Sequence, residues 1–167
     1  RERVEAVLRR QEPDRIPFVI WDNKFPAGKA GERLLEAGAC VIVKSAVYDS
    51  RLRTIPTQER AERLADGLAR RRVYHTPRGD LCTVAIARPQ TTWLCQRLFR
   101  SPKDYDAILS LVADYEYVPC YEKFARDDGR FGASGLARPA TEPSPLMRIM
   151  YEIMGLANFA VEWHERR

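Results

Sequence analysis

The chain has 167 residues, of which 45% are hydrophobic and 31% charged, and its formal net charge is +5. A chain of this length and apolar content can bury the core of one domain, so the composition excludes an intrinsically disordered protein. Its apolar runs are far shorter than the roughly 20 residues that a membrane-spanning helix needs, and its start lacks the core of a signal peptide. We therefore expect a cytoplasmic protein with no membrane partner.

Arginines spread along the chain supply most of the positive charge, with a local cluster at Arg70, Arg71, Arg72 and Arg78. Charge runs of this kind are usually solvated faces, and binding of a polyanion or a nucleic acid is the alternative. The sequence contains no zinc-finger spacing, RNP-type aromatic motif or basic helix followed by heptads. We therefore expect no nucleic-acid partner.

The four cysteines are scattered, without a Cys-x-x-Cys pair and without a histidine at metal-ligand spacing. This pattern predicts buried free thiols in a cytosolic protein and no metal site within these residues. The four are Cys40, Cys82, Cys95 and Cys120.

The first 45 residues read as two strands separated by a helix. Apolar residues at helical spacing predict a short helix over the first ten residues, and an apolar run predicts a buried strand over 16–21. A second short helix should end at Gly38, immediately before another buried strand over 40–43. This β-α-β order is typical of a parallel sheet.

The middle of the chain departs from this order. Residues 57–69 have apolar spacing that fits a helix, but they contain Asp66-Gly67, a dipeptide that nucleates β-hairpins. The next segment, 72–76, alternates and is rich in β-branched and aromatic residues, and a second turn follows over 76–80. We favour hairpins over a helix, which predicts an antiparallel excursion around residues 50–100.

The last third of the chain carries two clear helix starts, Ser101-Pro102 and Ser144-Pro145. The first should begin a helix that buries one apolar stripe, which consists of Tyr105, Ile108, Leu109 and Val112. A helix over 119–126 and a third parallel strand over 130–134 should follow. Residues 156–167 have the spacing of an amphipathic helix with no stop signal, so we expect the chain to be the N-terminal part of a larger protein.

Five segments together resemble the uroporphyrinogen decarboxylase superfamily, whose members include the porphyrin-pathway decarboxylase and corrinoid-linked methyltransferases. In order, they are RERV at 1–4, EPDRIP at 12–17, YHTPRGDL at 74–81, FRSPKDY at 99–105 and MGLANF at 154–159. Their order and spacing make a fairly specific signature. The resemblance implies an α/β fold that is an incomplete (β/α)8 TIM barrel, because a whole barrel typically needs about 250 residues. Residues 1–167 would be the N-terminal part of one such domain.

Members of this superfamily place the active site at the carboxyl ends of the barrel strands, where Ser45 would also lie. The resemblance therefore implies three catalytic candidates, which are Asp22, Lys24 and Asp49. It implies four substrate-binding candidates, which are Trp21, Tyr48, Arg138 and Glu142, with Arg138 the best anion-binding group among them. The structural alternatives are a salt-bridged loop for Asp22 and Lys24 and simple packing for Trp21.

The segment after the first strand separates two branches of the superfamily. True decarboxylases resemble one another in an RQAGR element whose arginines meet the substrate's carboxylates, whereas this chain has DNKFPAG at 22–28. Bidentate arginine is the natural clamp for a polycarboxylate, and an acid at the first position would repel it. We therefore favour methyl transfer linked to a corrinoid cofactor or corrinoid protein. The alternatives are uroporphyrinogen decarboxylation and a non-catalytic partial barrel with a binding or structural role.

The resemblance also implies cofactors and partners. Zinc and a corrinoid are candidate cofactors of the complete protein, with none expected in this fragment. The expected partners are a small-molecule substrate or a corrinoid protein. A partial barrel leaves sheet edges unpaired, which predicts a homodimer or aggregation of the isolated fragment.

Overall fold

The computed structural model describes residues 1–65, 67–88 and 91–166, and the chain divides into two compact units. The first unit comprises Arg1–Asp49 with Val118–Thr141, and the second comprises Ser50–Tyr117 with Glu142–Arg167. Parallel and antiparallel sheets are both present, and within the described residues the sheets are open and none closes into a barrel. The fold is therefore mixed α/β.

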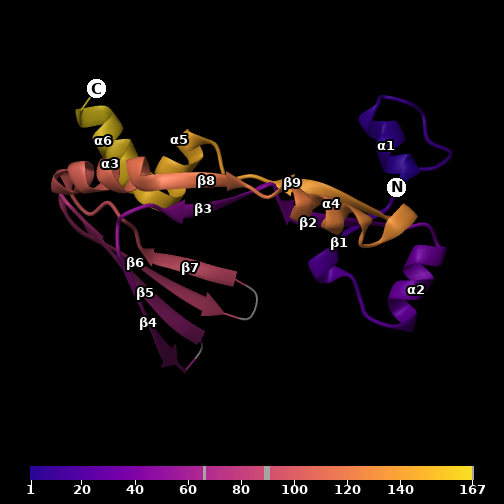
Figure 1. Ribbon diagram of the computed structural model, residues 1–167, viewed down its shortest axis with the longest axis horizontal. Helices are drawn as coiled ribbons and strands as arrows, with labels where there is room; N and C mark the ends of the chain where they lie inside the picture. The colour runs from indigo at the N-terminus through magenta and orange to yellow at the C-terminus, as the bar shows by residue number, and fades with distance from the viewer. Residues whose placement is uncertain (66, 89–90, 167) are drawn as a thin grey trace. The chain divides into compact units, whose positions relative to one another are not determined.

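The first unit is built on a three-stranded parallel sheet in which β2 lies between β1 and β9 (Figure 1). The strands are β1 (Val19–Trp21), β2 (Cys40–Ala46) and β9 (Gly135–Ala140). The helices of this unit are α1 (Glu2–Leu8), α2 (Lys29–Glu36) and α4 (Tyr121–Gly129), with 3-10 turns η1 (Asp22–Lys24) and η3 (Gly132–Ser134). The predicted β-α-β order and its parallel pairing are confirmed.

The strand β2 alternates between a covered and an open face. Val41, Val43 and Ser45 are buried, and α4 packs against β2 and β9 on this side. Ile42 is half-buried and Lys44 is exposed, so the other face of the strand is open. A strand with period-two burial needs only one covering layer, which here is α4.

Gly38 ends α2 as the sequence predicts. Its φ of +87° is left-handed, and its N–H donates to the carbonyl of Leu35 while the N–H of Ala39 donates to that of Leu34. This pair of hydrogen bonds is a Schellman motif, which satisfies carbonyls at the helix end and turns the chain directly into β2.

The predicted buried strand over 16–21 is wrong in extent and in burial. The strand β1 covers only Val19–Trp21, Ile16 is 91% exposed and Trp21 is 44% exposed. The physical reason is its position, because β1 is at the edge of its sheet and pairs with β2 alone within the described residues. Apolar composition predicted a strand, but whether its side chains are buried depends on the strands and helices packed around it.

The third parallel strand exists, but the prediction of 130–134 is wrong. The strand β9 begins only at Gly135, and 132–134 form a 3-10 turn. Phe131 is held outside the sheet by an edge-to-face contact with Phe25, at 5.5 Å between ring centroids. A Cβ at Gly135 would lie 2.5 Å from the Cβ of Phe131, so only glycine allows the strand to start beneath this ring.

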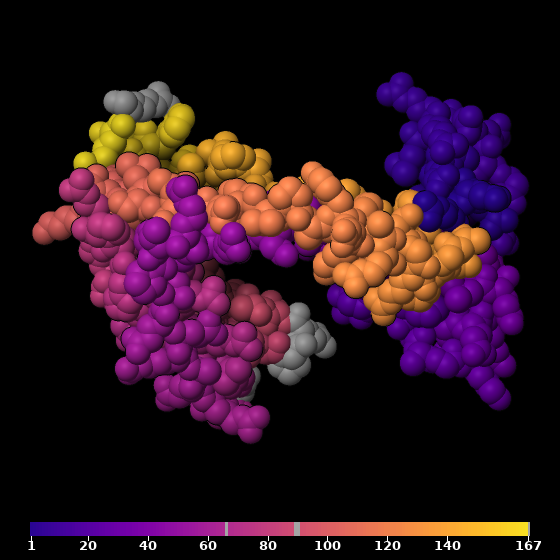
Figure 2. Space-filling view, viewed as in Figure 1, coloured from indigo at the N-terminus to yellow at the C-terminus, as the bar shows by residue number. Residues whose placement is uncertain are grey.

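The second unit contains a four-stranded antiparallel sheet in the order β4-β5-β6-β7. The strands are β4 (Thr57–Leu64), β5 (Gly67–Thr76), β6 (Gly79–Arg88) and β7 (Thr91–Gln96). Figure 1 shows the four strands side by side, and in Figure 2 their residues form the purple to rose region. The antiparallel excursion and the preference for a hairpin over a helix are confirmed, although Asp66 lies outside the described residues.

The rest of the second unit is mainly helical. It contains η2 (Pro102–Asp104), α3 (Tyr105–Asp114), α5 (Pro145–Arg148), the π-helical turn η4 (Ile149–Ile153) and α6 (Leu156–Glu165). Both predicted caps are confirmed, because Asp104 accepts from the Ser101 N–H at 3.0 Å and Ser144 accepts from the Met147 N–H at 3.4 Å. The strands β3 (Tyr48–Leu52) and β8 (Tyr115–Pro119) form a separate two-stranded sheet, and each of them has residues in both units.

The buried face of α3 differs from the predicted stripe. Leu109 is 65% exposed and Val112 is 47% exposed, whereas Ala107, Ile108 and Leu111 are buried against the antiparallel sheet. The sequence offers two overlapping apolar stripes on this helix. Packing on β5 and β6 selects the one that contains Leu111, and so the prediction is wrong for Leu109 and Val112.

The cysteine prediction is correct only in part. All four thiols are free, and Cys40 and Cys82 are buried, but Cys95 is exposed and Cys120 is half-buried. Cys95 lies on β7, which is at one edge of the antiparallel sheet. None of the helices in the described ranges is long and apolar enough to span a membrane.

Asp114, at the end of α3, is a buried acid that organises the segment before β4. Its carboxylate accepts hydrogen bonds from the Thr54 hydroxyl at 2.6 Å, the Thr54 N–H at 3.0 Å and the Ile55 N–H at 2.9 Å. These donors stabilise the ionised form and lower the pKa of Asp114 from 3.8 to about 2. The carboxylate thereby fixes Ile55, which is part of the core.

The two leucines of α3 provide a direct test of the core. Leu111→Ala should lower the free energy of unfolding by about 2–5 kcal/mol, because Leu111 is buried and its removal leaves a cavity. Leu109→Ala is the matched control on the exposed face and should change it by less than about 0.5 kcal/mol. Urea denaturation of the full chain measures both, and equal losses would contradict this packing.

The hydrogen bonds of Asp114 predict a dependence of stability on pH. Because the folded pKa is about 2 and the ordinary value is 3.8, the ionised side chain stabilises the fold above about pH 4. That stabilisation should disappear as pH falls from about 4 to about 2. Thermal unfolding should therefore show wild type more stable than Asp114→Asn near pH 6, with the two converging toward pH 2. Parallel curves would refute the assignment.

Candidate functional site

The parallel register places Trp21, Lys44 and Arg138 on the open face of the first unit's sheet. Trp21 pairs with Ile42, and Ile42 with Leu136, so these side chains form one row across the three strands. Two residues further along, Lys44 pairs with Arg138. Because side chains two positions apart share a face, the second row lies on the same side as the first.

Trp21 and Arg138 are brought into contact. The guanidinium carbon of Arg138 lies 5.5 Å from the centroid of a Trp21 ring, which is a cation–π arrangement. The strand β2 lies between their strands, so the Arg138 side chain reaches across β2 to make this contact. The contact places the positive charge of Arg138 beside the Trp21 ring.

Asp22 pairs with an arginine rather than with Lys24. Its carboxylate lies 3.4 Å from the Arg130 guanidinium, and its side chain is 23% exposed. Lys24 is exposed in the turn η1. The predicted Asp22–Lys24 pair is thus replaced by an ion pair to the end of α4, which the sequence did not reveal.

Asp22 and Asp49 follow strands whose carboxyl ends lie at different positions along the strand direction. The strand β1 ends at Trp21, opposite Ile42, which is four residues before the end of β2 at Ala46. At about 3.3 Å per residue, this offset is roughly 13 Å along the strand. Asp49 follows still later, in β3, where it is exposed and Tyr48 is half-buried. The described hydrogen bonds and ion pairs do not join Asp49 to Asp22 or Lys24.

Ser45 points to the covered face of β2. It is completely buried and donates a hydrogen bond to Asp127 of α4 at 2.6 Å, and Lys123 lies 3.0 Å from the same carboxylate oxygen. The Ser45 hydroxyl and then Lys123 lower the pKa of Asp127 below its ordinary value. Ser45 therefore anchors α4 on the side of the strand opposite to Lys44.

Glu142 belongs to the second unit and is engaged there. Its carboxylate forms an ion pair with Arg148 at 2.5 Å, and the Tyr117 hydroxyl lies 3.5 Å away. The Arg148 guanidinium also stacks over the Tyr115 ring at 5.1 Å from its centroid. This polar cluster borders an apolar cavity of about 430 Å³ between α3 and η4.

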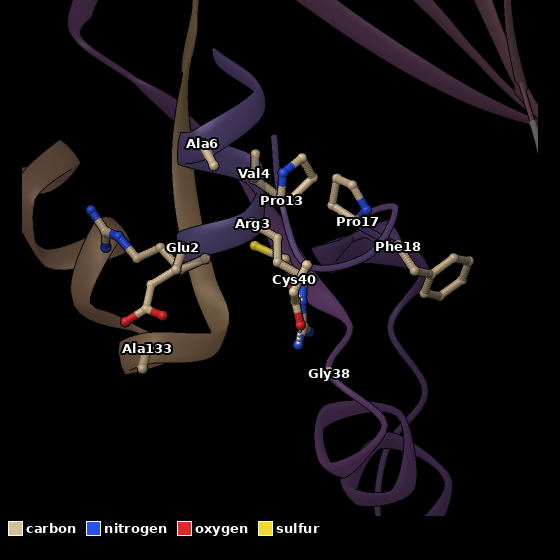
Figure 3. Close-up of a pocket in the computed structure, with 12 residues that line it drawn as sticks. Glu2, Arg3, Val4, Ala6, Pro13, Pro17, Phe18, Gly38, Cys40 and Ala133 are labelled. Atoms are coloured by element: carbon tan, nitrogen blue, oxygen red, sulfur yellow. Dashed lines mark hydrogen bonds and ion pairs between the residues drawn. The ribbon is translucent and has the colours of Figure 1, made fainter. Parts of the chain in front are cut away.

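A cavity of about 530 Å³ lies at the opposite, amino end of the parallel strands. Figure 3 shows side chains of α1 beside Cys40 and Gly38 at the start of β2, with the Phe18 ring turned away from them. Both arginines here are ion-paired, since Arg3 donates to Asp14 at 2.8 Å and Arg1 pairs with Asp128 at 3.0 Å. Paired charges at the amino end of parallel strands indicate stabilisation rather than catalysis.

The sequence reasoning did not select Lys44, Asp127 or Arg130 as functional residues. A signal for Lys44 is present, because it is the one charged residue in the apolar run of β2 and lies on the opposite face from Val43 and Ser45. The partners Asp127 and Arg130 carry no such signal, since each depends on how α4 docks. In the described ranges, no three His, Cys, Asp or Glu residues gather as metal ligands.

Comparison with known proteins finds no match, whether to a family model, a curated protein or a solved structure.

The hydrogen bond between Ser45 and Asp127 predicts a measurable pKa change. Ser45→Ala removes the main group that stabilises ionised Asp127, so the pKa of Asp127 should rise toward 3.8. Because the folded pKa is the lower one, the stabilisation that this carboxylate provides above its ordinary pKa is lost as pH falls. Carboxyl NMR titration measures the shift. Ser110→Ala is the control, because the Ser110 hydroxyl donates to a backbone carbonyl, that of Asp106. An unchanged Asp127 pKa in Ser45→Ala would contradict the contact.

Proposed function

We propose that this chain is part of a cytoplasmic enzyme of the uroporphyrinogen decarboxylase superfamily that transfers a methyl group with a corrinoid cofactor or corrinoid protein. The chain would supply the first part of a (β/α)8 barrel. The support is the parallel sheet with α4 on one face and an open face on the other. In a barrel, the helices cover the outside and the uncovered face of the strands turns inward.

The observation that carries the methyl-transfer branch is the environment of Asp22. In the decarboxylases that the chain resembles, arginines at this place bind the substrate's carboxylates. Here an acid takes that place and holds Arg130 in an ion pair. A carboxylate paired with the nearby arginine leaves that arginine less free to clamp a polycarboxylate, and it repels carboxylates itself.

The residues of this chain would act in binding and in proton handling. Trp21 provides an aromatic wall, Arg138 a fixed positive charge, and Asp22 a partly buried carboxylate that can accept or hold a proton beside a bound substrate. A corrinoid would supply the methyl-group chemistry itself. Zinc binding and homodimer formation remain predictions of the resemblance.

Uroporphyrinogen decarboxylation is the second candidate, and one observation favours it. Lys44 and Arg138 place two positive charges side by side on the open face of the sheet. Such a pair would attract the carboxylates of a porphyrinogen in place of the missing arginine element.

The complete protein that contains this chain tests both reactions. With methylcobalamin and a thiol acceptor, methyl transfer should change the cobalamin absorbance, and Asp22→Asn should slow it about a hundredfold if the carboxylate handles a proton. Lys29→Ala, on the exposed side of α2, is the control and should leave the rate unchanged. Consumption of uroporphyrinogen without methyl transfer would establish the second candidate. Turnover of neither substrate would refute both and leave a binding or structural role.

A further inference from the structure

We propose that Lys44, Arg138 and Trp21 form a binding site for an oxyanion, the carboxylate or phosphoryl group of a small molecule, on the open face of the parallel sheet. This inference goes beyond the proposed function, because it needs only the geometry of β1, β2 and β9 and no particular reaction.

Two like charges are paired on the open face of the sheet. Lys44 and Arg138 are register partners on adjacent parallel strands, so their side chains leave the same face about 4.8 Å apart at the backbone. Like charges directly opposite each other destabilise a sheet, and folds normally avoid them or neutralise them. Two exposed cations at paired positions are therefore a cost that a bound anion would offset.

No acid within the described residues, 1–65, 67–88 and 91–166, forms an ion pair with either of these cations. Asp22, which directly follows Trp21, is paired with Arg130. On the far side of β2, Asp127 is held by Ser45 and Lys123. The open face thus keeps two positive charges without a counter-charge.

The Arg138 side chain is held by Trp21 before any anion binds. Its stacking over Trp21 restrains a side chain that otherwise loses considerable conformational entropy when it binds a ligand. Among the described residues, no hydrogen bond engages the guanidinium N–H groups of Arg138, so they can donate to an anion. A planar fork beside the point charge of Lys44 is the combination that binds carboxylate and phosphate oxygens.

The strands that carry the two cations, β2 and β9, are both anchored to α4. Ser45, the residue after Lys44, is hydrogen-bonded to Asp127, and the N–H of Ala137, the residue before Arg138, donates to Asp128 at 2.8 Å. Both acids belong to α4. The helix therefore holds β2 and β9 from behind at the level of the two cations, and this support fixes their spacing before any ligand arrives.

Trp21 provides the probe for a binding experiment. In the full chain carrying Trp93→Phe and Trp163→Phe, Trp21 is the only tryptophan, and its fluorescence reports the position of the Arg138 guanidinium. Inorganic phosphate and sodium acetate are titrated separately at constant ionic strength, with sodium chloride as the balancing salt. We expect a saturable fluorescence change with at least one of them, matched by heat in calorimetry.

The variants separate a site from general positive charge. Lys44→Ala and Arg138→Ala should each weaken binding roughly tenfold, since each removes one charged partner. Lys29→Ala removes the same charge from α2 in the same unit and should leave the affinity unchanged. Calorimetry is the readout for Arg138→Ala, because that change alters Trp21 fluorescence before any anion is added.

Each outcome bears on the proposal. Saturation by phosphate alone assigns a phosphoryl group, and saturation by acetate alone assigns a carboxylate. The site would be overturned if the fluorescence change did not saturate or was no larger than that caused by chloride. It would also be overturned if Lys29→Ala lowered the affinity as much as Lys44→Ala does. Absence of methyl transfer in the complete protein, with anion binding intact, would refute the proposed function and leave this site standing.

Discussion

Hydrogen bonding of β2 to a parallel strand on each side is the constraint on which the candidate site depends. The pairing with β1 sets Trp21 opposite Ile42, and the pairing with β9 sets Arg138 opposite Lys44. A slip of one residue in either register would move the side chains of that strand to the other face. The contact between Trp21 and Arg138 is therefore a consequence of two registers. The helix α4 packs against β2 and β9 on the other face.

The charges of the first unit fall into two groups with different physical meaning. At the amino end of the strands, Arg1 and Arg3 are paired with Asp128 and Asp14, so the arginines that line the cavity there already have counter-charges. On the open face of the sheet, Lys44 and Arg138 are exposed to solvent, and neither forms an ion pair with an acid of the described residues. Cavity size alone would favour the first location, whereas unbalanced charge on a supported sheet favours the second.

Local chemistry explains which elements were predictable. The caps at Ser101 and Ser144, the stop at Gly38 and the turn before β6 each depend on residues a few positions apart, and each is confirmed. Predictions that required a distant partner were less accurate. The start of β9 depends on where Phe131 packs, and the burial of β1 depends on how many strands lie beside it. Neither is recorded in the local sequence.

The sequence by itself determined most of the helices, turns and strands and their order, because capping, turn geometry and apolar periodicity act over a few residues, but it did not reveal β3 or β8. It also marked Trp21, Asp22 and Arg138 as candidates, through the resemblance. Only the tertiary structure decided that Asp22 pairs with Arg130, that Ser45 faces α4, and that Lys44 stands beside Arg138. These contacts join residues far apart in the chain, and they follow from strand register and helix docking, which are set by the packing of the whole unit.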